Sequence, residues 1–141
     1  MSGFLLDTNC ISEIVRAKPE PSVVEWLEAT EETMLNLSVL TLGEIRKGLA
    51  GLAQGKRRTR LESWLEVELQ TRFAGRILPV DTAIADRWGV IATEAKRRGK
   101  ALSVIDGLLA ATALHYNLTV VSRNASDFMG VQVQVLNPWE G

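Results

Sequence analysis

The sequence predicts an α/β fold in which a mainly parallel sheet is covered by helices on both faces. The main observation is an alternation along the chain. Short apolar runs typical of buried strands are separated by longer stretches whose apolar residues recur every three or four positions, as in helices. A second observation is size, because 141 residues with a hydrophobic fraction of 46% suffice for one ordinary core. We therefore expect a single domain, residues 1–141.

The first half of the chain contains two strand candidates, residues 4–6 and 34–37, each followed by helices. The first helix is expected to stop before Pro19, and a second begins near Pro21. Another helix is expected from Thr41 onward. The apolar residues at helical spacing are Ile11, Ile14, Val15, Val24, Trp26, Leu27, Leu42, Ile45, Leu49 and Leu52.

The second half repeats this alternation. A helix is expected over residues 57–73, with Leu61, Trp64, Leu65 and Leu69 on one side. A long helix should end at Gly99, since glycine is the usual residue just past a helix. The glycines between positions 48 and 55 indicate a helix end and a turn and not a domain boundary. The remaining expected elements are strands 76–80, 118–121 and 133–136 and helices 81–98 and 104–116.

Composition excludes several kinds of chemistry. Sixteen basic and seventeen acidic residues give a net charge of −1, so any contact with nucleic acid must come from a local basic patch. Cys10 is the single cysteine and His115 the single histidine, which excludes an intrachain disulfide and argues against a histidine relay or a multi-histidine zinc site. Carboxylates must therefore carry any catalysis. Because Asp7 interrupts the N-terminal apolar stretch and no run could span a bilayer, we expect a soluble, cytoplasmic protein without membrane contact.

Four acids are expected at one edge of the sheet. In open parallel sheets, ligands bind beyond the carboxyl ends of the strands. Asp7 ends the first strand, Asp106 opens the helix that precedes the fourth strand, and Asp127 follows that strand. Glu44 lies on the helix after the second strand. Their convergence predicts an acidic functional site.

Each acid also has a local explanation as a residue that stabilises a helix start. A hydroxyl or amide side chain three positions before an acid is the pattern of a capping box or a capped turn. This interpretation is weaker for four acids at one edge than for any one of them. The patterns concerned are Thr41-x-x-Glu44, Ser103-x-x-Asp106 and Asn124-x-x-Asp127, with Asp7 as a lone N-cap.

Electrostatics favours a cation at such a site. Two carboxylates about 5 Å apart repel by roughly 3 kcal/mol at an effective dielectric constant of about 20. Four together would protonate, spread apart or bind cations. An all-oxygen site without cysteine or clustered histidine suits Mg²⁺ or Mn²⁺ better than Zn²⁺. Such ions activate water and neutralise charge on a phosphodiester, so phosphodiester hydrolysis is the reaction best suited to these residues.

Four segments in order also carry a resemblance to a known family. They are LDTNCISE at 6–13, TLGEIRKG at 41–48, SVIDGLLAATA at 103–113 and SRNASDF at 122–128. Together these segments resemble the motifs of PIN-domain toxins, the VapC-like and FitB-like group of type II toxin–antitoxin systems. None of the four is specific alone, but four in register are a strong signal that spans nearly the whole chain.

The resemblance implies a five-stranded PIN fold, RNA cleavage that depends on Mg²⁺ or Mn²⁺, a cognate antitoxin as inhibitor, and a homodimer. By motif, Asp7, Glu44 and Asp106 correspond to the core acids and Asp127 to a fourth, more variable one. Asp7 and Asp106 are then expected as direct metal ligands. Glu44 would bind metal or orient water, and Asp127 would bind a second metal directly or through water.

Supporting roles are expected for neighbouring polar residues, although turn and capping roles explain the same residues equally well. Arg46, two residues beyond Glu44, is positioned to pair with an acid or to contact phosphate. The other candidates are Thr8, Asn9 and Ser12, which would hold Asp7 or a bound water, and Asn124, which would do so for Asp127.

Two mild departures from the family pattern stand out. Ser122 occupies a position where threonine is common, and Gly107 follows Asp106 where a larger residue is common and could loosen the helix start. The basic runs at 56–60 and 96–100 either steer RNA phosphates or form solvated helix faces and helix ends. The four tryptophans fit core or dimer packing better than base stacking.

Two other functions are conceivable for a chain with this pattern. A PIN fold that only binds RNA or its antitoxin, with negligible catalysis, is disfavoured because all four acids are present. A phosphatase or phosphoacceptor domain on a similar sheet is also disfavoured. Haloacid-dehalogenase-like phosphatases need an aspartate two residues beyond the first, where this chain has Asn9, and receiver domains need a late lysine, but none follows Lys100.

Overall fold

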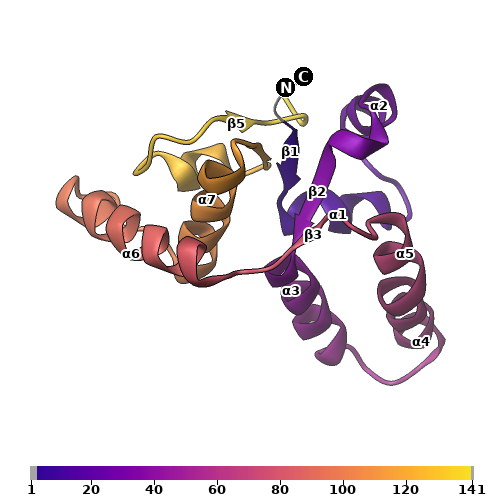
Figure 1. Cartoon of the computed structure of the whole chain (residues 1–141). Helices are drawn as coiled ribbons and strands as arrows, with labels where there is room; N and C mark the ends of the chain where they lie inside the picture. The colour runs from indigo at the N-terminus through magenta and orange to yellow at the C-terminus, as the bar shows by residue number, and fades with distance from the viewer. Residues whose placement is uncertain (1–2, 141) are drawn as a thin grey trace.

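The computed structural model describes residues 3–140, which contain a five-stranded parallel sheet with strand order β3-β2-β1-β4-β5 (Figure 1). β1 is the central strand, with Leu5 opposite Asn36 of β2 and Val120 of β4. The predicted parallel sheet is confirmed. The strands are β1 (Phe4–Leu6), β2 (Leu35–Ser38), β3 (Ile77–Leu78), β4 (Thr119–Val121) and β5 (Val135–Leu136).

Helices cover both faces of this sheet (Figure 1). One group comprises α1 (Thr8–Ile14), α2 (Pro21–Ala29), α3 (Val39–Ala50), α4 (Lys56–Ser63), the π-helical segment η2 (Trp64–Leu69) and α5 (Gln70–Arg72). The other group comprises α6 (Thr82–Arg97) and α7 (Val104–Tyr116), which pack along each other. Two short 3₁₀ turns, η1 (Glu32–Met34) and η3 (Ala125–Phe128), precede β2 and follow β4.

The two faces of the sheet have separate hydrophobic cores because side chains alternate along a strand. In β1, Leu6 packs with α1, α2, α3 and η2, whereas Leu5 packs with α6 and α7. In β4, Val121 and Val120 divide in the same way. Near-continuous apolar strands are therefore buried on both sides, as expected for a parallel sheet.

The start of α3 corrects the sequence analysis, which placed it at Thr41. The helix begins at Val39, with the hydroxyl of Ser38 accepting a hydrogen bond from Leu40 N at 3.0 Å. Thr41 is fully buried inside the first turn, so Thr41 and Glu44 do not form a capping box. The strand and helix follow each other without a loop, and this brings Glu44 close to the end of β2.

The expected helix 57–73 is present as a continuous helical stretch from Lys56 to Arg72 that widens into π geometry in its middle. Its apolar residues recur every four positions, at Leu61, Leu65 and Leu69. In a regular α-helix such a repeat drifts by about 40° at each step. The wider π turn offsets this drift, and Leu65, Leu69 and the following Phe73 are all buried in one core.

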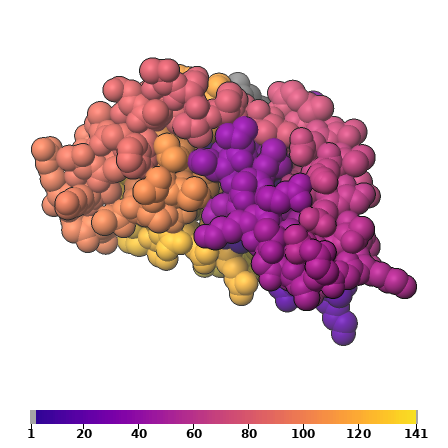
Figure 2. All heavy atoms as spheres, turned by 90° about the horizontal axis from the view of Figure 1, so that it is seen from below, coloured from indigo at the N-terminus to yellow at the C-terminus, as the bar shows by residue number. Residues whose placement is uncertain are grey.

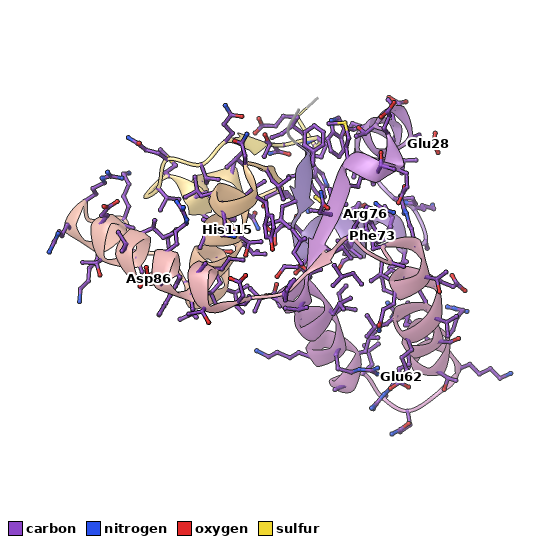
Figure 3. All side chains as sticks on the ribbon, in the orientation of Figure 1. Glu28, Glu62, Phe73, Arg76, Asp86 and His115 are labelled. Atoms are coloured by element: carbon purple, nitrogen blue, oxygen red, sulfur yellow. The ribbon has the colours of Figure 1, made fainter. Side chains whose placement is uncertain are left out.

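Arg76 connects the end of this helical stretch to β2 through hydrogen bonds. Its guanidinium donates hydrogen bonds to the backbone oxygens of Glu32, Leu35 and Arg72 at 2.5–2.6 Å. It also lies 5.0 Å from the ring centroid of Phe73, the neighbour labelled beside it in Figure 3. The strand that follows is shorter than the expected 76–80, since only Ile77–Leu78 pair with β2.

The long helix α6 begins and ends as predicted. Asp81 caps it by accepting from Ile84 N at 2.9 Å, and Gly99 leaves it with a positive φ of 73°. Gly107, which was expected to loosen the helix start, is buried near the start of α7. A Cβ at this position would lie 2.8 Å from the ring of Trp88 on α6, so the glycine instead lets the two helices approach closely.

Candidate acidic active site

Asp7 stands where β1 ends and α1 begins, and its carboxylate is held firmly. It is 8% exposed and accepts hydrogen bonds from Thr8 N at 2.8 Å and from Ser122 Oγ at 2.7 Å. Asn9 Nδ2 lies 3.4 Å from the same carboxylate. Ser122 directly follows β4, so this bond joins the carboxyl ends of two neighbouring strands. Asp7 is thus the N-cap of α1 and also a fixed acid at the sheet edge.

The pKa of Asp7 is raised, chiefly because burial disfavours the carboxylate. The hydrogen bonds from Ser122 and Thr8 oppose this effect, whereas the charges of Glu44 and Asp127 add to it. Three acids from distant parts of the sequence therefore influence one another electrostatically.

Glu44 reaches this edge from α3 and is held by α1. Thr8 Oγ1 lies 2.5 Å from Glu44 Oε1, and the hydroxyl of Thr41 lies 3.5 Å from that of Thr8. Thr8 thus contacts Asp7 through its backbone N–H and Glu44 through its side chain. From the sequence, Thr8 was expected to hold Asp7 or a bound water, and its contact with Glu44 was not expected.

Asp106 lies in the first turn of α7 and is half-buried. The N-cap Ser103 accepts from Asp106 N at 3.1 Å, as the capping pattern predicted. The pKa of Asp106 is raised by burial, in opposition to a hydrogen bond from Ser103, and further by the charges of Asp7, Asp127 and Glu44. The backbone of Asp106 therefore takes part in the helix cap, while its carboxylate belongs to the acid cluster.

Asp127 lies in η3 and is exposed. Its backbone N–H donates to Asn124 O at 3.0 Å, but the side chain of Asn124 caps nothing. Asn124 N instead donates to Ser122 Oγ at 3.1 Å. Ser122 is the site residue that the sequence analysis did not assign, and its hydroxyl in the fourth motif was the available signal.

The remaining residues expected to support the acids either lie apart from them or contact them weakly. Asn9 is close to Asp7, and its Oδ1 accepts from Arg123 N at 3.3 Å. Ser12 is exposed and, within residues 3–140, its side chain makes no hydrogen bond to Asp7. Arg46 forms ion pairs with Glu62 and Glu66 on the neighbouring helical stretch, at 3.4 Å each, and with none of the four acids.

Glu13, which belongs to the first motif, has a structural role. It is 3% exposed, and its carboxylate accepts from Glu20 N at 2.9 Å and from Arg16 Nη1 at 3.1 Å. The hydrogen bond from the Glu20 backbone, helped by Arg16, lowers the pKa of Glu13. These contacts close the turn between α1 and α2.

The four acids have the right chemistry to bind a hard divalent cation, because each offers carboxylate oxygens as ligands. The described residues do not, however, bring three acidic, imidazole or thiolate side chains together around one point closely enough to enclose an ion. Mg²⁺ commonly binds through one or two carboxylates, with waters and phosphate oxygens completing the shell. The arrangement fits that mode and not a closed protein cage.

Two hollows of different chemistry flank the acids. A groove of about 1100 Å³ between α1, α3, α4 and η2 has an apolar floor that includes Leu49, Leu61 and Trp64, and it reaches Thr8 and Glu44. A pocket of about 410 Å³ lies beside Asp106 and Asp127, and the two hollows share no residue. Figure 2 shows the underside of the molecule, where α3 (purple) adjoins α7 (orange) and the yellow C-terminal segment.

Comparison with known proteins agrees with this fold. The PIN domain model matches residues 4–129. VapC ribonuclease Y4jK of Sinorhizobium fredii is 39% identical over 97% of this chain and 98% of its own length. Toxin FitB of Neisseria gonorrhoeae is 42% identical over 96% and 98%. The crystal structure of FitAcB from Neisseria gonorrhoeae superposes with a TM-score of 0.93 at 41% identity, covering 98% of this chain and 99% of that one.

The chain therefore belongs to the PIN-domain family, and within it to the group that contains the VapC and FitB toxins. A second FitAB structure, solved with the IR36 DNA fragment, has a TM-score of 0.92 at 40% identity and covers 96% of this chain and 95% of that one. None of the helices in residues 3–140 has the length and apolar character needed to cross a membrane.

Proposed function

We propose that this chain is an endoribonuclease that uses Mg²⁺ or Mn²⁺ and acts as the toxin of a toxin–antitoxin pair. The observation that carries the proposal is the acid cluster at the carboxyl edge of the sheet. Asp7 and Asp106, almost a hundred positions apart, each have a raised pKa to which the other acids' charges contribute. Mutually repelling carboxylates of this kind favour cation binding. Two relatives, a VapC ribonuclease and the toxin FitB, support the same function.

In this proposal Asp7 and Asp106 hold the ion directly, while Glu44 and Asp127 bind directly or through water. When bound, the ion lowers the pKa of a water molecule and neutralises charge on the phosphodiester. The chain's own residues fix the carboxylates. Ser122 orients Asp7, and Thr8 links Asp7 to Glu44. Acids held in one orientation reduce the entropic cost of reaching the reactive geometry.

We further propose that a cognate antitoxin inhibits the chain by binding the groove that ends at Glu44. Its apolar floor, with Arg57 and Arg60 at the rim, fits an amphipathic protein segment better than a polyanionic strand. A segment there would cover Thr8 and Glu44. Relatives at about 40% identity were solved as FitAB complexes, which supports a protein partner for this chain. Homodimer formation and action in the cytoplasm, where RNA is the substrate, belong to the same proposal.

One observation favours a second candidate, a module that binds RNA or antitoxin with little catalysis. The described acids do not enclose a point as a preformed metal cage would. Titration of the purified protein with Mn²⁺, followed by calorimetry, separates the two candidates. Binding that is lost in Asp106→Asn favours the nuclease, and absence of binding favours the module.

The direct experiment is cleavage of a structured RNA pool with Mn²⁺ or Mg²⁺, with EDTA as the metal-free control. Asp7→Asn and Asp106→Asn should abolish cleavage while the circular dichroism spectrum stays unchanged. The matched control is Asp86→Asn, an exposed residue of α6 (labelled in Figure 3) whose charge does not contribute to the raised pKa of Asp7 or Asp106, and it should cut at the wild-type rate. Full activity in either acid variant would remove that residue from the mechanism.

A further inference from the structure

The smaller pocket beside Asp106 and Asp127 combines basic, hydroxyl and apolar side chains with the two acids. Its lining includes Lys100, Ser126 and Met129 together with the two acids. Met129 is 64% exposed, so its apolar side chain is accessible to a ligand. Within residues 3–140, the Lys100 ammonium forms no ion pair and the Ser126 hydroxyl no hydrogen bond. A cation, a hydroxyl and an apolar surface are thus all available to a ligand.

The position of Lys100 is fixed by the backbone around it. After Gly99 turns the chain with its positive φ, Lys100 N donates to Ala95 O at 2.9 Å. Gly130 packs against this turn so closely that a Cβ there would lie 2.4 Å from Lys100 O. The guanidinium of Arg98 donates to Gly130 O at 3.2 Å. These contacts hold the turn after α6 against the segment after η3, with the pocket between them.

The structure also separates the members of the basic run 96–100, whose role the sequence left open. Lys96 and Arg97 lie in the last turn of α6, where cations are favoured by the helix dipole. Arg98 is engaged with Gly130. Lys100 is the member of the run that lines the pocket with the acids. A helix-end role therefore explains the first two residues but not Lys100.

We propose that this pocket binds the nucleotide adjacent to the scissile phosphate of a single-stranded RNA segment, with Lys100 contacting its phosphate. The inference rests on the proposed nuclease function. Four carboxylates repel a polyanionic substrate, and a chain with net charge −1 supplies no overall attraction, so a cation beside the acids has a specific use. Met129 would pack against the base or ribose, and the Ser126 hydroxyl would bind a polar group of the same nucleotide.

The test is binding of a fluorescein-labelled single-stranded RNA oligonucleotide, followed by anisotropy in EDTA over a series of KCl concentrations. Lys100→Ala should weaken binding on the order of tenfold, as expected for loss of a charged phosphate contact. The slope of log affinity against log salt should fall by about 0.7, the value for one phosphate contact on a single strand. Lys100→Arg should bind nearly as wild type. The matched control Lys96→Ala, from the same run but outside the pocket, should change affinity less than twofold.

Equal effects of Lys100→Ala and Lys96→Ala would overturn the proposal, since Lys100 would then act only through general charge. If Lys100→Ala keeps its RNA affinity but no longer binds the antitoxin, the pocket belongs to the protein partner. This result would also overturn the proposal. Failure of the two proposals is distinguishable by adding Mn²⁺. If RNA binding depends on Lys100 but no cleavage occurs, the RNA-binding pocket is supported and the nuclease function is contradicted. If cleavage occurs but does not depend on Lys100, the nuclease function is supported and the pocket proposal is contradicted. Wild-type protein that binds no RNA in either buffer overturns both.

Discussion

Ser122 Oγ donates a hydrogen bond of 2.7 Å to Asp7 Oδ2 across a separation of 115 residues in sequence. The two residues follow the adjacent strands β4 and β1, and both are buried. The same serine oxygen accepts from Asn124 N, at the start of the segment that carries Asp127. One hydroxyl thus connects the most buried acid of the cluster to the segment that bears the most exposed one.

Removal of this hydroxyl should destabilise the charged form of Asp7. In Ser122→Ala the carboxylate keeps its burial but loses a donor, so its pKa should rise further, and the acidic limb of the pH–rate profile should move to higher pH. The free energy of unfolding at neutral pH should fall by about 1–3 kcal/mol, as for a buried group left unsatisfied. Ser122→Thr retains the hydroxyl and should restore the profile. An unshifted profile in the alanine variant would contradict this role.

The pH dependence of stability should report the burial of Asp106 and, to a smaller extent, the repulsion among the acids. The folded pKa of Asp106 is raised above the ordinary aspartate value of 3.8, so the folded protein holds this proton more tightly than the unfolded chain. The stabilisation from this group is therefore present below the unfolded pKa and is lost as pH rises through the folded pKa. In EDTA, Asp106→Asn should gain stability relative to wild type over that window, measured by urea unfolding at several pH values. A constant difference between the two proteins would contradict the assignment.

Thr8 should matter for catalysis through Glu44. Its hydroxyl lies 2.5 Å from Glu44 Oε1, so Thr8→Val removes the contact while preserving side-chain shape. We expect kcat to fall on the order of tenfold with little change in melting temperature, because a misplaced catalytic group costs rate and not folding. Thr8→Ser keeps the hydroxyl and should retain most of the activity. If the valine variant turned over as fast as the serine variant, Thr8 would have no positioning role.

Gly107 and Gly89 provide a matched pair for helix packing. Gly107→Ala should reduce the free energy of unfolding by about 1–3 kcal/mol, because the new methyl group would meet the Trp88 ring at 2.8 Å. Gly89→Ala on α6 meets no atom within 4 Å and should stabilise by about 0.5–1 kcal/mol through helix propensity. Urea unfolding followed by tryptophan fluorescence measures both. Equal changes in the two variants would show that close packing at Gly107 is unimportant.

The sequence predicted most of the elements because hydrophobic periodicity and end signals are local. α7 was predicted with its observed bounds, and the end of the long helix α6 at Gly99 is confirmed. The errors arose where a local pattern had a competing partner. Thr41 resembled a cap, but Ser38 one turn earlier already begins the helix. The close contact between Gly107 and Trp88 was likewise absent from any local pattern.

For the site, the sequence by itself predicted the four acids, their order and the strand or helix with which each is associated. Those properties depend on neighbouring residues, and the topology of a parallel sheet then directs them to one edge. Only the tertiary structure decided which side chains hold the acids. It assigned Ser122 to Asp7 and Thr8 to Glu44, and it paired Arg46 with Glu62 and Glu66. The physical reason is range: a hydrogen bond or ion pair depends on distances of a few ångströms between residues remote in sequence, and no local pattern encodes those distances.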